Sequence, residues 1–219
     1  MAFDDSTVSA PRLVSVTWTR LPGWCDRFDA RHVDSNWQIG PDAVKVENAD
    51  GTSARFDIPF APLRETTMSG LLAHLDTPRP MGVLLVRRGG FAVARLLGTH
   101  VVDSKVGRRH VQGRTKAGGW SQQRFARRRD NQAQLAFAAA GDYAEAILAP
   151  APHLVILGAG GDRQGLDVVL NRPRLRSLAR APRRQLTVTG DPRRQELLAA
   201  VDQLTSVSIQ ITDGNRRMQ

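Results

Sequence analysis

Two adjacent glutamines, Gln122 and Gln123, follow the glycine pair Gly118-Gly119 inside the most basic stretch of the chain. That stretch, residues 105–129, holds nine Lys or Arg and no acidic residue. An amide is a poor acid or base, but it can orient a water against an ester, and N–H groups at a helix start can stabilise an oxyanion. Adjacent glycines let a backbone pass where a side chain would clash. The stretch therefore indicates positioning chemistry on a nucleic-acid-linked substrate.

The charge of the whole chain also favours a polyanionic partner. It has 31 Lys and Arg against 21 Asp and Glu, a net charge of +10. A surplus that large favours RNA, DNA or an acidic membrane surface. An Arg-rich proteome would explain the total but not the cluster, because acidic residues intersperse the basic ones elsewhere. The other interpretation of the cluster, a segment that contacts RNA without doing chemistry, stays open.

Other kinds of site find little support in the sequence. Its single cysteine, Cys25, allows no intrachain disulfide or cysteine zinc site, and the five histidines show no ligand spacing. Only Asp103 comes from the predicted meander, which is too few carboxylates for a two-metal nuclease. The run GAGG at residues 158–161 lacks the G-x-G-x-x-G spacing of a nucleotide site and is predicted to be an ordinary loop. No apolar run approaches a membrane span and the N-terminus is no secretory signal, so we expect a cytoplasmic protein without a membrane partner.

The elements that position the basic stretch fall into two predicted parts. Residues 1–79 are predicted to form a small α+β unit, in which an Asp-Gly turn at residues 49–52 joins two strands of a hairpin. The proline-rich residues 77–80 are typical of a linker. Residues 80–219 are predicted to form the second domain, with a basic loop at residues 105–120.

The second domain shows a regular order of elements. An antiparallel meander is predicted at residues 82–87, 91–97 and 99–104. A long helix follows at 121–149, with Ser121 as its N-cap. One face of this helix is expected to carry Phe125, Gln132, Leu135, Ala139, Tyr143 and Ile147. A buried strand, a helix, a strand and a helix come next, at residues 153–157, 166–170, 185–189 and 192–204. The order β-β-β-α-β-α-β-α is that of an RNase H-like mixed sheet, a mixed α/β or α+β fold.

The segment GGWSQQRFARRR, residues 118–129, resembles a motif of one known family. Class-I peptide release factors of eukaryotes and archaea carry GGQSxxRFxRxR, a Gly-Gly-Gln loop that runs straight into a helix. The chain matches this pattern at Gly118, Gly119, Ser121, Arg124, Phe125, Arg127 and Arg129. Residues 153–162, HLVILGAGGD, look like the next strand of that catalytic domain. The resemblance covers about residues 80–213, without the codon-recognition and C-terminal domains of those factors.

The chain departs from the family pattern at one position. Trp120 stands where the release factors have glutamine, and glutamine appears two residues later, as Gln122. This displaced form is similar to the Vms-type hydrolases of ribosome quality control, which free nascent chains from peptidyl-tRNA on stalled large subunits. The compact Vms-like release factors of actinobacteria are what the chain resembles most. Gln122 and Gln123 both remain candidates for the working residue.

The resemblance implies a metal-independent peptidyl-tRNA hydrolase with an RNase H-like release-factor catalytic domain. Gln122 or Gln123, carried by Gly118 and Gly119, would enter the peptidyl-transferase centre and place water on the ester carbonyl. The implied partners are the rRNA of the large ribosomal subunit and the 3′ end of peptidyl-tRNA. We expect a monomer with no cofactor and no metal. The residues expected to contact RNA are Lys105, Arg108, Arg109, Arg114, Lys116, Trp120, Arg124, Arg127, Arg128 and Arg129.

Several alternatives stay open beside this hypothesis. A non-catalytic surveillance module would bind ribosomes or RNA in a salt-sensitive way without hydrolysing an ester. A tRNA 3′-end endonuclease would leave CCA nucleotides on the released peptide. Trp120 is expected either to stack on a base, worth about 1–3 kcal/mol, or to pack against its own domain. We expect residues 105–119 to be disordered in the free protein, since like charges repel and glycine adds entropy.

Overall fold

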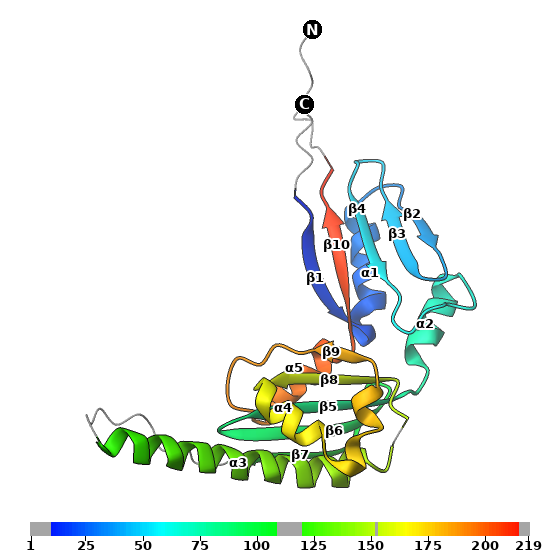
Figure 1. The fold of residues 1–219 in the computed structure, drawn as a ribbon. Helices are drawn as coiled ribbons and strands as arrows, with labels where there is room; N and C mark the ends of the chain where they lie inside the picture. Colours follow the sequence, from blue (N-terminus) through cyan, green and yellow to red (C-terminus); the bar gives the residue numbers. More distant parts are fainter. Residues whose placement is uncertain (1–9, 109–119, 152, 215–219) are drawn as a thin grey trace. The chain divides into compact units, whose positions relative to one another are not determined.

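The computed structural model describes residues 10–108, 120–151 and 153–214. The chain forms two compact units, each built on a five-stranded sheet (Figure 1). Met1–Thr77 and Thr205–Gln219 make the first unit, and Pro78–Leu204 makes the second. The predicted α+β fold with a mixed sheet in the second unit is confirmed. Its likeness to an RNase H-like sheet stays a prediction.

The first unit is an antiparallel sheet with the strand order β1-β10-β4-β3-β2. Its strands are β1 (Arg12–Thr17), β2 (Asn36–Ile39), β3 (Ala43–Glu47), β4 (Ser53–Asp57) and β10 (Ser206–Thr212). Its helical elements are the 3-10 turn η1 (Trp18–Arg20), α1 (Leu21–Arg31) and α2 (Met68–Asp76). The predicted hairpin joins β3 to β4. Its turn needs glycine because Gly51 has a φ of 81°, which side chains disfavour. Within the same turn, Thr52 N–H donates to Asp50 Oδ1 at 2.8 Å.

Strand β10 changes the predicted domain boundary. We expected residues 80–219 to form one domain, but β10 pairs with β1 on one side and with β4 on the other. Its alternate residues Val207, Ile209 and Ile211 are buried in the first unit. Two hydrogen-bonded neighbours and a buried apolar face hold this strand in the first sheet. The second unit is therefore an insertion between α2 and β10.

The second unit follows the predicted order β-β-β-α-β-α-β-α. Its elements are β5 (Pro80–Arg87), β6 (Gly90–Leu97), β7 (His100–Arg108), α3 (Trp120–Leu148), β8 (Ile156–Gly161), α4 (Arg163–Leu170), the 3-10 turns η2 (Pro173–Leu175) and η3 (Leu178–Arg180), β9 (Arg183–Gln185) and α5 (Arg194–Leu204). The strand order is β7-β6-β5-β8-β9, with an antiparallel meander and with β8 parallel to both β5 and β9. None of the described helices has the length and apolar character needed to cross a bilayer.

Helix α3 packs on the sheet through a face that differs from the predicted one. The buried residues are Ala133, Ala136, Phe137, Ala140, Ala144, Ile147 and Leu148. Of the predicted face, Ile147 is buried, Ala139 packs against the core and Gln132 is half-buried, but Leu135 is 63% exposed and Tyr143 is 39% exposed. The alanines form a flat stripe that lets the helix backbone approach the strands closely. The predicted face was drawn through the large apolar residues of the helix, whereas the close contact between α3 and the sheet is made mainly by alanines.

The GAGG run, predicted to be a loop, forms the last four of the six residues of strand β8 and pairs with β5. Gly158 and Gly160 are buried because the chain at Leu186 crosses directly over them. A Cβ at Gly158 would lie 2.8 Å from Leu186 Cδ1, and one at Gly160 would lie 2.6 Å from the Leu186 carbonyl oxygen. Close packing therefore explains these two glycines.

Candidate nucleic-acid interface

The basic stretch leaves the second unit at one edge of its sheet. Strands β5 and β7 run in the same direction, and their register places Arg87, Gly90 and Arg108 in one row across β5, β6 and β7. We expected a disordered loop from Lys105 onward, but residues 105–108 extend β7 and pair with β6. The ladder hydrogen bonds to β6 hold this backbone even though Lys105 and Arg108 are exposed.

Helix α3 projects past this same edge (Figure 1). Leu148 lies against the beginning of β5, and Phe137 lies against its end. At a rise of about 1.5 Å per residue, Trp120 is therefore about 25 Å farther along the helix axis than Phe137. No described side chain of α3 before Ala133 is buried. Residues 120–132, which we call the projecting segment, stand away from the sheet, and Arg127 is exposed on it.

The projecting segment contains most of the predicted site residues. The helical backbone of residues 120–129 includes Trp120, Gln122, Gln123, Arg124, Arg127, Arg128 and Arg129. Ser121, predicted to be the N-cap, is already the second residue of the helix. The first four N–H groups of a helix lack helical acceptors and carry the positive end of its dipole, which favours an anionic ligand there. Five predicted site residues lie outside the described part of the chain: Arg109, Arg114, Lys116, Gly118 and Gly119. The expected disorder of residues 109–119 and the two interpretations of the Trp120 side chain likewise concern groups outside the described part and stay predictions.

Lys105 contributes to packing between β7 and α3, which the sequence analysis missed. Its ammonium nitrogen lies 5.1 Å from the centre of the Tyr143 ring. Tyr143 in turn stacks on Phe91 of β6, with ring centres 5.4 Å apart and planes at 27°. A Cβ at Gly107 would collide with the Phe91 ring. These contacts join the end of the meander to the helix that carries the predicted site.

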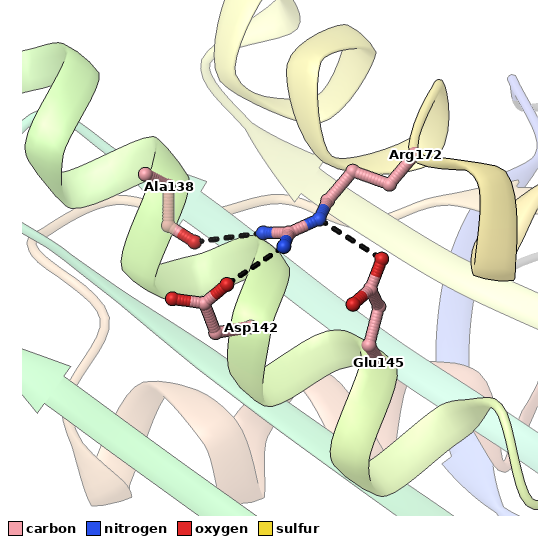
Figure 2. A network of polar contacts seen from close by, with 4 residues as sticks. All are labelled: Ala138, Asp142, Glu145 and Arg172. Carbon is pink, nitrogen blue, oxygen red and sulfur yellow. Dashed lines mark hydrogen bonds and ion pairs between the residues drawn. The ribbon is translucent and has the colours of Figure 1, made fainter.

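A second contact between elements fixes helix α3 through Arg172, which follows α4 (Figure 2). Its Nε donates to Glu145 Oε1 at 3.0 Å, its Nη2 to Asp142 Oδ1 at 2.7 Å and its Nη1 to the Ala138 carbonyl oxygen at 3.0 Å. We call these four residues the Arg172 network. A Cβ at Gly141 would overlap the guanidinium, so glycine allows the close approach.

The electrostatics of the Arg172 network keep its cation charged. Burial by itself would lower the pKa of Arg172, but the hydrogen bonds and charges of Asp142 and Glu145 raise the pKa above its usual value. Glu145 is only 16% exposed at its side chain, so its carboxylate depends on this partner. The network was invisible in the sequence because its members are separated by about thirty residues without a local pattern.

The second unit thus combines a mixed sheet, a basic stretch and a helix that begins beyond the sheet edge, which is consistent with an α+β release-factor domain. The family model described as "Actinobacteria/chloroflexi VLRF1 release factor" matches residues 79–210, which is more than half of the chain. The chain belongs to this VLRF1 release factor family of actinobacteria and chloroflexi. No curated protein matches the chain. Family membership assigns it a release-factor-like role in translation.

Proposed function

We propose that the protein is a peptidyl-tRNA hydrolase that releases nascent chains from stalled large ribosomal subunits in ribosome quality control. The observation that carries this proposal is the projecting segment of α3, which begins about 20 Å beyond Ala133, the first buried residue described in the helix. A helix start that stands away from its own domain can reach a narrow site formed by another molecule. Family membership supports an ester of tRNA as the substrate.

The reaction follows from the residues at that helix start. A water oxygen attacks the ester carbonyl, the bond to the ribose oxygen of the terminal nucleotide breaks, and a proton of that water ends on the ribose oxygen, so that the peptide acid and free tRNA separate. Gln122 or Gln123 would orient the water, and the first N–H groups of α3 would stabilise the negative charge that develops on the carbonyl oxygen. Arg124, Arg127, Arg128 and Arg129 would bind phosphates of rRNA and tRNA.

The two glutamines can be separated by experiment because neighbouring residues of a helix point about 100° apart. Only one of them can then occupy a given place beside the ester. The test is release of nascent peptide from purified large subunits that carry peptidyl-tRNA. It compares the wild type with Gln122→Ala, Gln123→Ala and the matched control Gln134→Ala, an exposed glutamine farther along α3.

We expect one of the two variants to lose at least about tenfold in release rate, or more than about 1.4 kcal/mol in the barrier, with subunit binding little changed. Gln134→Ala should release at the wild-type rate. Equal release by all variants would remove both glutamines from the mechanism. Bound wild type that releases nothing would favour the non-catalytic module. CCA nucleotides on the released peptide, detected by mass spectrometry, would favour the endonuclease.

A further inference from the structure

A pocket of about 580 Å³ opens in the second unit at the ends of three strands. Arg87, Gly161 and Gln185, the last residues of β5, β8 and β9, all line it. These strands are parallel, so the pocket lies at the carboxyl edge of the sheet. After β8 the chain enters α4, which packs with α3, and after β9 it enters α5 on the opposite face. The strand order reverses between β5 and β8, and ligands of open α/β sheets bind outside the carboxyl ends of the strands at such a reversal.

Two glycines keep the space open. A Cβ at Gly89 would lie 2.6 Å from Asp191 Oδ1, so the absence of a side chain allows the carboxylate to lie against the turn between β5 and β6. Gly161 has a φ of 107°, and a Cβ there would collide with the Val86 carbonyl oxygen. Larger residues at either position would fill or distort the pocket.

The loop that carries Asp191 is held in place by Arg87. Arg87 Nη1 donates to the carbonyl oxygens of Val188 at 3.3 Å and Gly190 at 3.1 Å. Both bonds span the pocket from β5 to the segment that precedes α5. The carboxylate of Asp191 is therefore presented by a fixed backbone, beside Gly89, and Asp191 is exposed to solvent.

The neighbouring Arg88 has more freedom. Its side chain is 56% exposed, and its Nε lies 3.6 Å from Asp162 Oδ2, beyond hydrogen-bonding distance. Asp162 itself is fixed, because its Oδ1 accepts hydrogen bonds from the N–H groups of Gln164 and Gly165 at the start of α4. Arg88 can therefore turn toward an anion while Asp162 stays in place. The described residues contain no cluster of three or more His, Cys, Asp or Glu that could hold a metal.

We infer that this pocket binds a ribose-phosphate unit, with Arg88 on the phosphate and Asp191 accepting a hydrogen bond from the ribose 2′-hydroxyl. A guanidinium and a carboxylate that line the same pocket fit a ligand that has one anionic group next to hydroxyl donors. A carboxylate that binds ribose at the carboxyl edge of a parallel sheet is a recurrent arrangement. The pocket volume lies in the range of small-ligand sites.

The pocket and the basic stretch share one sheet edge. Arg87 of the pocket and Arg108 at the end of β7 flank Gly90 in the strand register, about 10 Å apart at the usual strand spacing. A strand of RNA that contacts the basic stretch would therefore reach the pocket. This inference deepens the proposed function and rests on it, because the RNA is taken to be the one that the projecting segment contacts.

The test measures binding of the full-length protein to a labelled single-stranded RNA and to the DNA of the same sequence, by fluorescence anisotropy. The pocket variants are Arg88→Met, Asp191→Asn and Gly89→Ala. Of these, only Gly89→Ala leaves every charge unchanged. The controls are Arg174→Met and Asp167→Asn, both exposed and outside the pocket. Thermal unfolding of each variant checks that it is folded. Competition by adenosine 5′-monophosphate and by its 2′-deoxy form distinguishes a free nucleotide from a nucleotide within a strand.

Asp191→Asn gives the sharpest result, because its expected effect has the opposite sign to simple charge repulsion. Removing a carboxylate near RNA would ordinarily strengthen binding, but replacing the charged acceptor of the ribose hydrogen bond by a neutral amide oxygen, a weaker acceptor, should weaken RNA binding about tenfold and reduce the preference for RNA over DNA. Gly89→Ala should weaken RNA binding in the same way, and Arg88→Met should weaken binding of both strands. Displacement of RNA by adenosine 5′-monophosphate, but not by its 2′-deoxy form, would make free ribonucleotides ligands too.

Unchanged or tighter RNA binding by folded Asp191→Asn and Gly89→Ala would overturn the inference, as would an equal loss in the two controls. The release assay separates this result from the proposed function. If the pocket variants bind RNA normally while glutamine-dependent release persists, only the pocket assignment fails. If they lose RNA binding while the wild type releases no peptide, the pocket stands and the hydrolase proposal fails.

Discussion

Lys105 and Arg108 were both predicted to contact RNA, but the structure gives them different surroundings. The Lys105 ammonium lies over the Tyr143 ring, where it adds to packing between β7 and α3. Arg108 is exposed at the end of β7, on the sheet edge from which the basic stretch departs. Two cations three residues apart can therefore differ in what they stabilise.

We expect Lys105→Met to lower the free energy of unfolding by about 0.5–1 kcal/mol, the usual value of an exposed cation–π contact. Urea titration would measure this change, and Arg108→Met should leave stability unaltered. For RNA binding we expect Arg108→Met to have the larger effect of the two variants. It should reduce the slope of the logarithm of the RNA binding constant against the logarithm of salt concentration by about 0.7 for a single strand, as expected for one lost phosphate contact. Equal slopes for Arg108→Met and wild type would contradict a phosphate contact at Arg108.

At the scale of elements, the direction of α3 matters because its N-terminal end, which carries Gln122 and Gln123, is far from the residues that fix the helix to the rest of the unit. The Arg172 network reaches α3 between Ala138 and Glu145, at least sixteen residues from Gln122. That separation is about 24 Å along the helix axis, so a small tilt at the network becomes a large displacement at the glutamines. The network therefore fixes both the packing of the helix and the direction in which the projecting segment leaves the sheet.

Gly141→Ala tests the Arg172 network through the sign of its effect. In an exposed helix interior, replacing glycine by alanine usually stabilises by about 0.5–1 kcal/mol. Here the new Cβ would overlap the Arg172 guanidinium, so we expect Gly141→Ala to lower the midpoint of thermal unfolding. In an Arg172→Ala background the same change should stabilise, as in an ordinary helix. Stabilisation in both backgrounds would show that the guanidinium does not lie against Gly141.

The sequence predicted elements well where their pattern is local. Apolar runs identified the meander, and the Asp-Gly turn identified the β3–β4 hairpin. The predicted strand at residues 153–157 ended before the glycines of β8 because glycines signal loops, although Gly158 and Gly160 are needed for close packing against Leu186. The buried face of α3 was misjudged because alanines carry little weight in an apolar pattern. Arg172 and the pocket could not be predicted, since both depend on contacts between residues far apart in the chain.

At the scale of the whole molecule, the two units have separate cores. Cys25 is buried in the core of the first unit, so its titration can be used to follow the stability of that unit. The thiol is 6% exposed in helix α1. Burial, together with the charges of Asp29 and Asp26, raises the pKa of Cys25 from 9.0 to about 12. The native thiol is therefore protonated at neutral pH and unreactive as a nucleophile.

This raised pKa makes the first unit less stable in alkali. A group whose folded-state pKa lies above its unfolded value contributes its full stability below the unfolded value, here 9.0, and loses it as pH rises toward about 12. We expect the free energy of unfolding to fall by at most about 1.4 kcal/mol per pH unit in this window. Cys25→Ala should lack this part of the fall when urea titrations at pH 8 and pH 10 are compared. Parallel losses in both proteins would assign the effect to other groups.

The position of β10 has a consequence for how the chain is made. In most proteins the amino-terminal part folds first as it emerges from the ribosome. Here β1 hydrogen-bonds within its sheet to β10 alone, and β10 is synthesised only after residues 78–204. The inserted unit can therefore fold before β10 has been synthesised and the sheet of the first unit is complete. The release-factor domain of this translation factor can therefore be complete before the unit that contains β1 and β10.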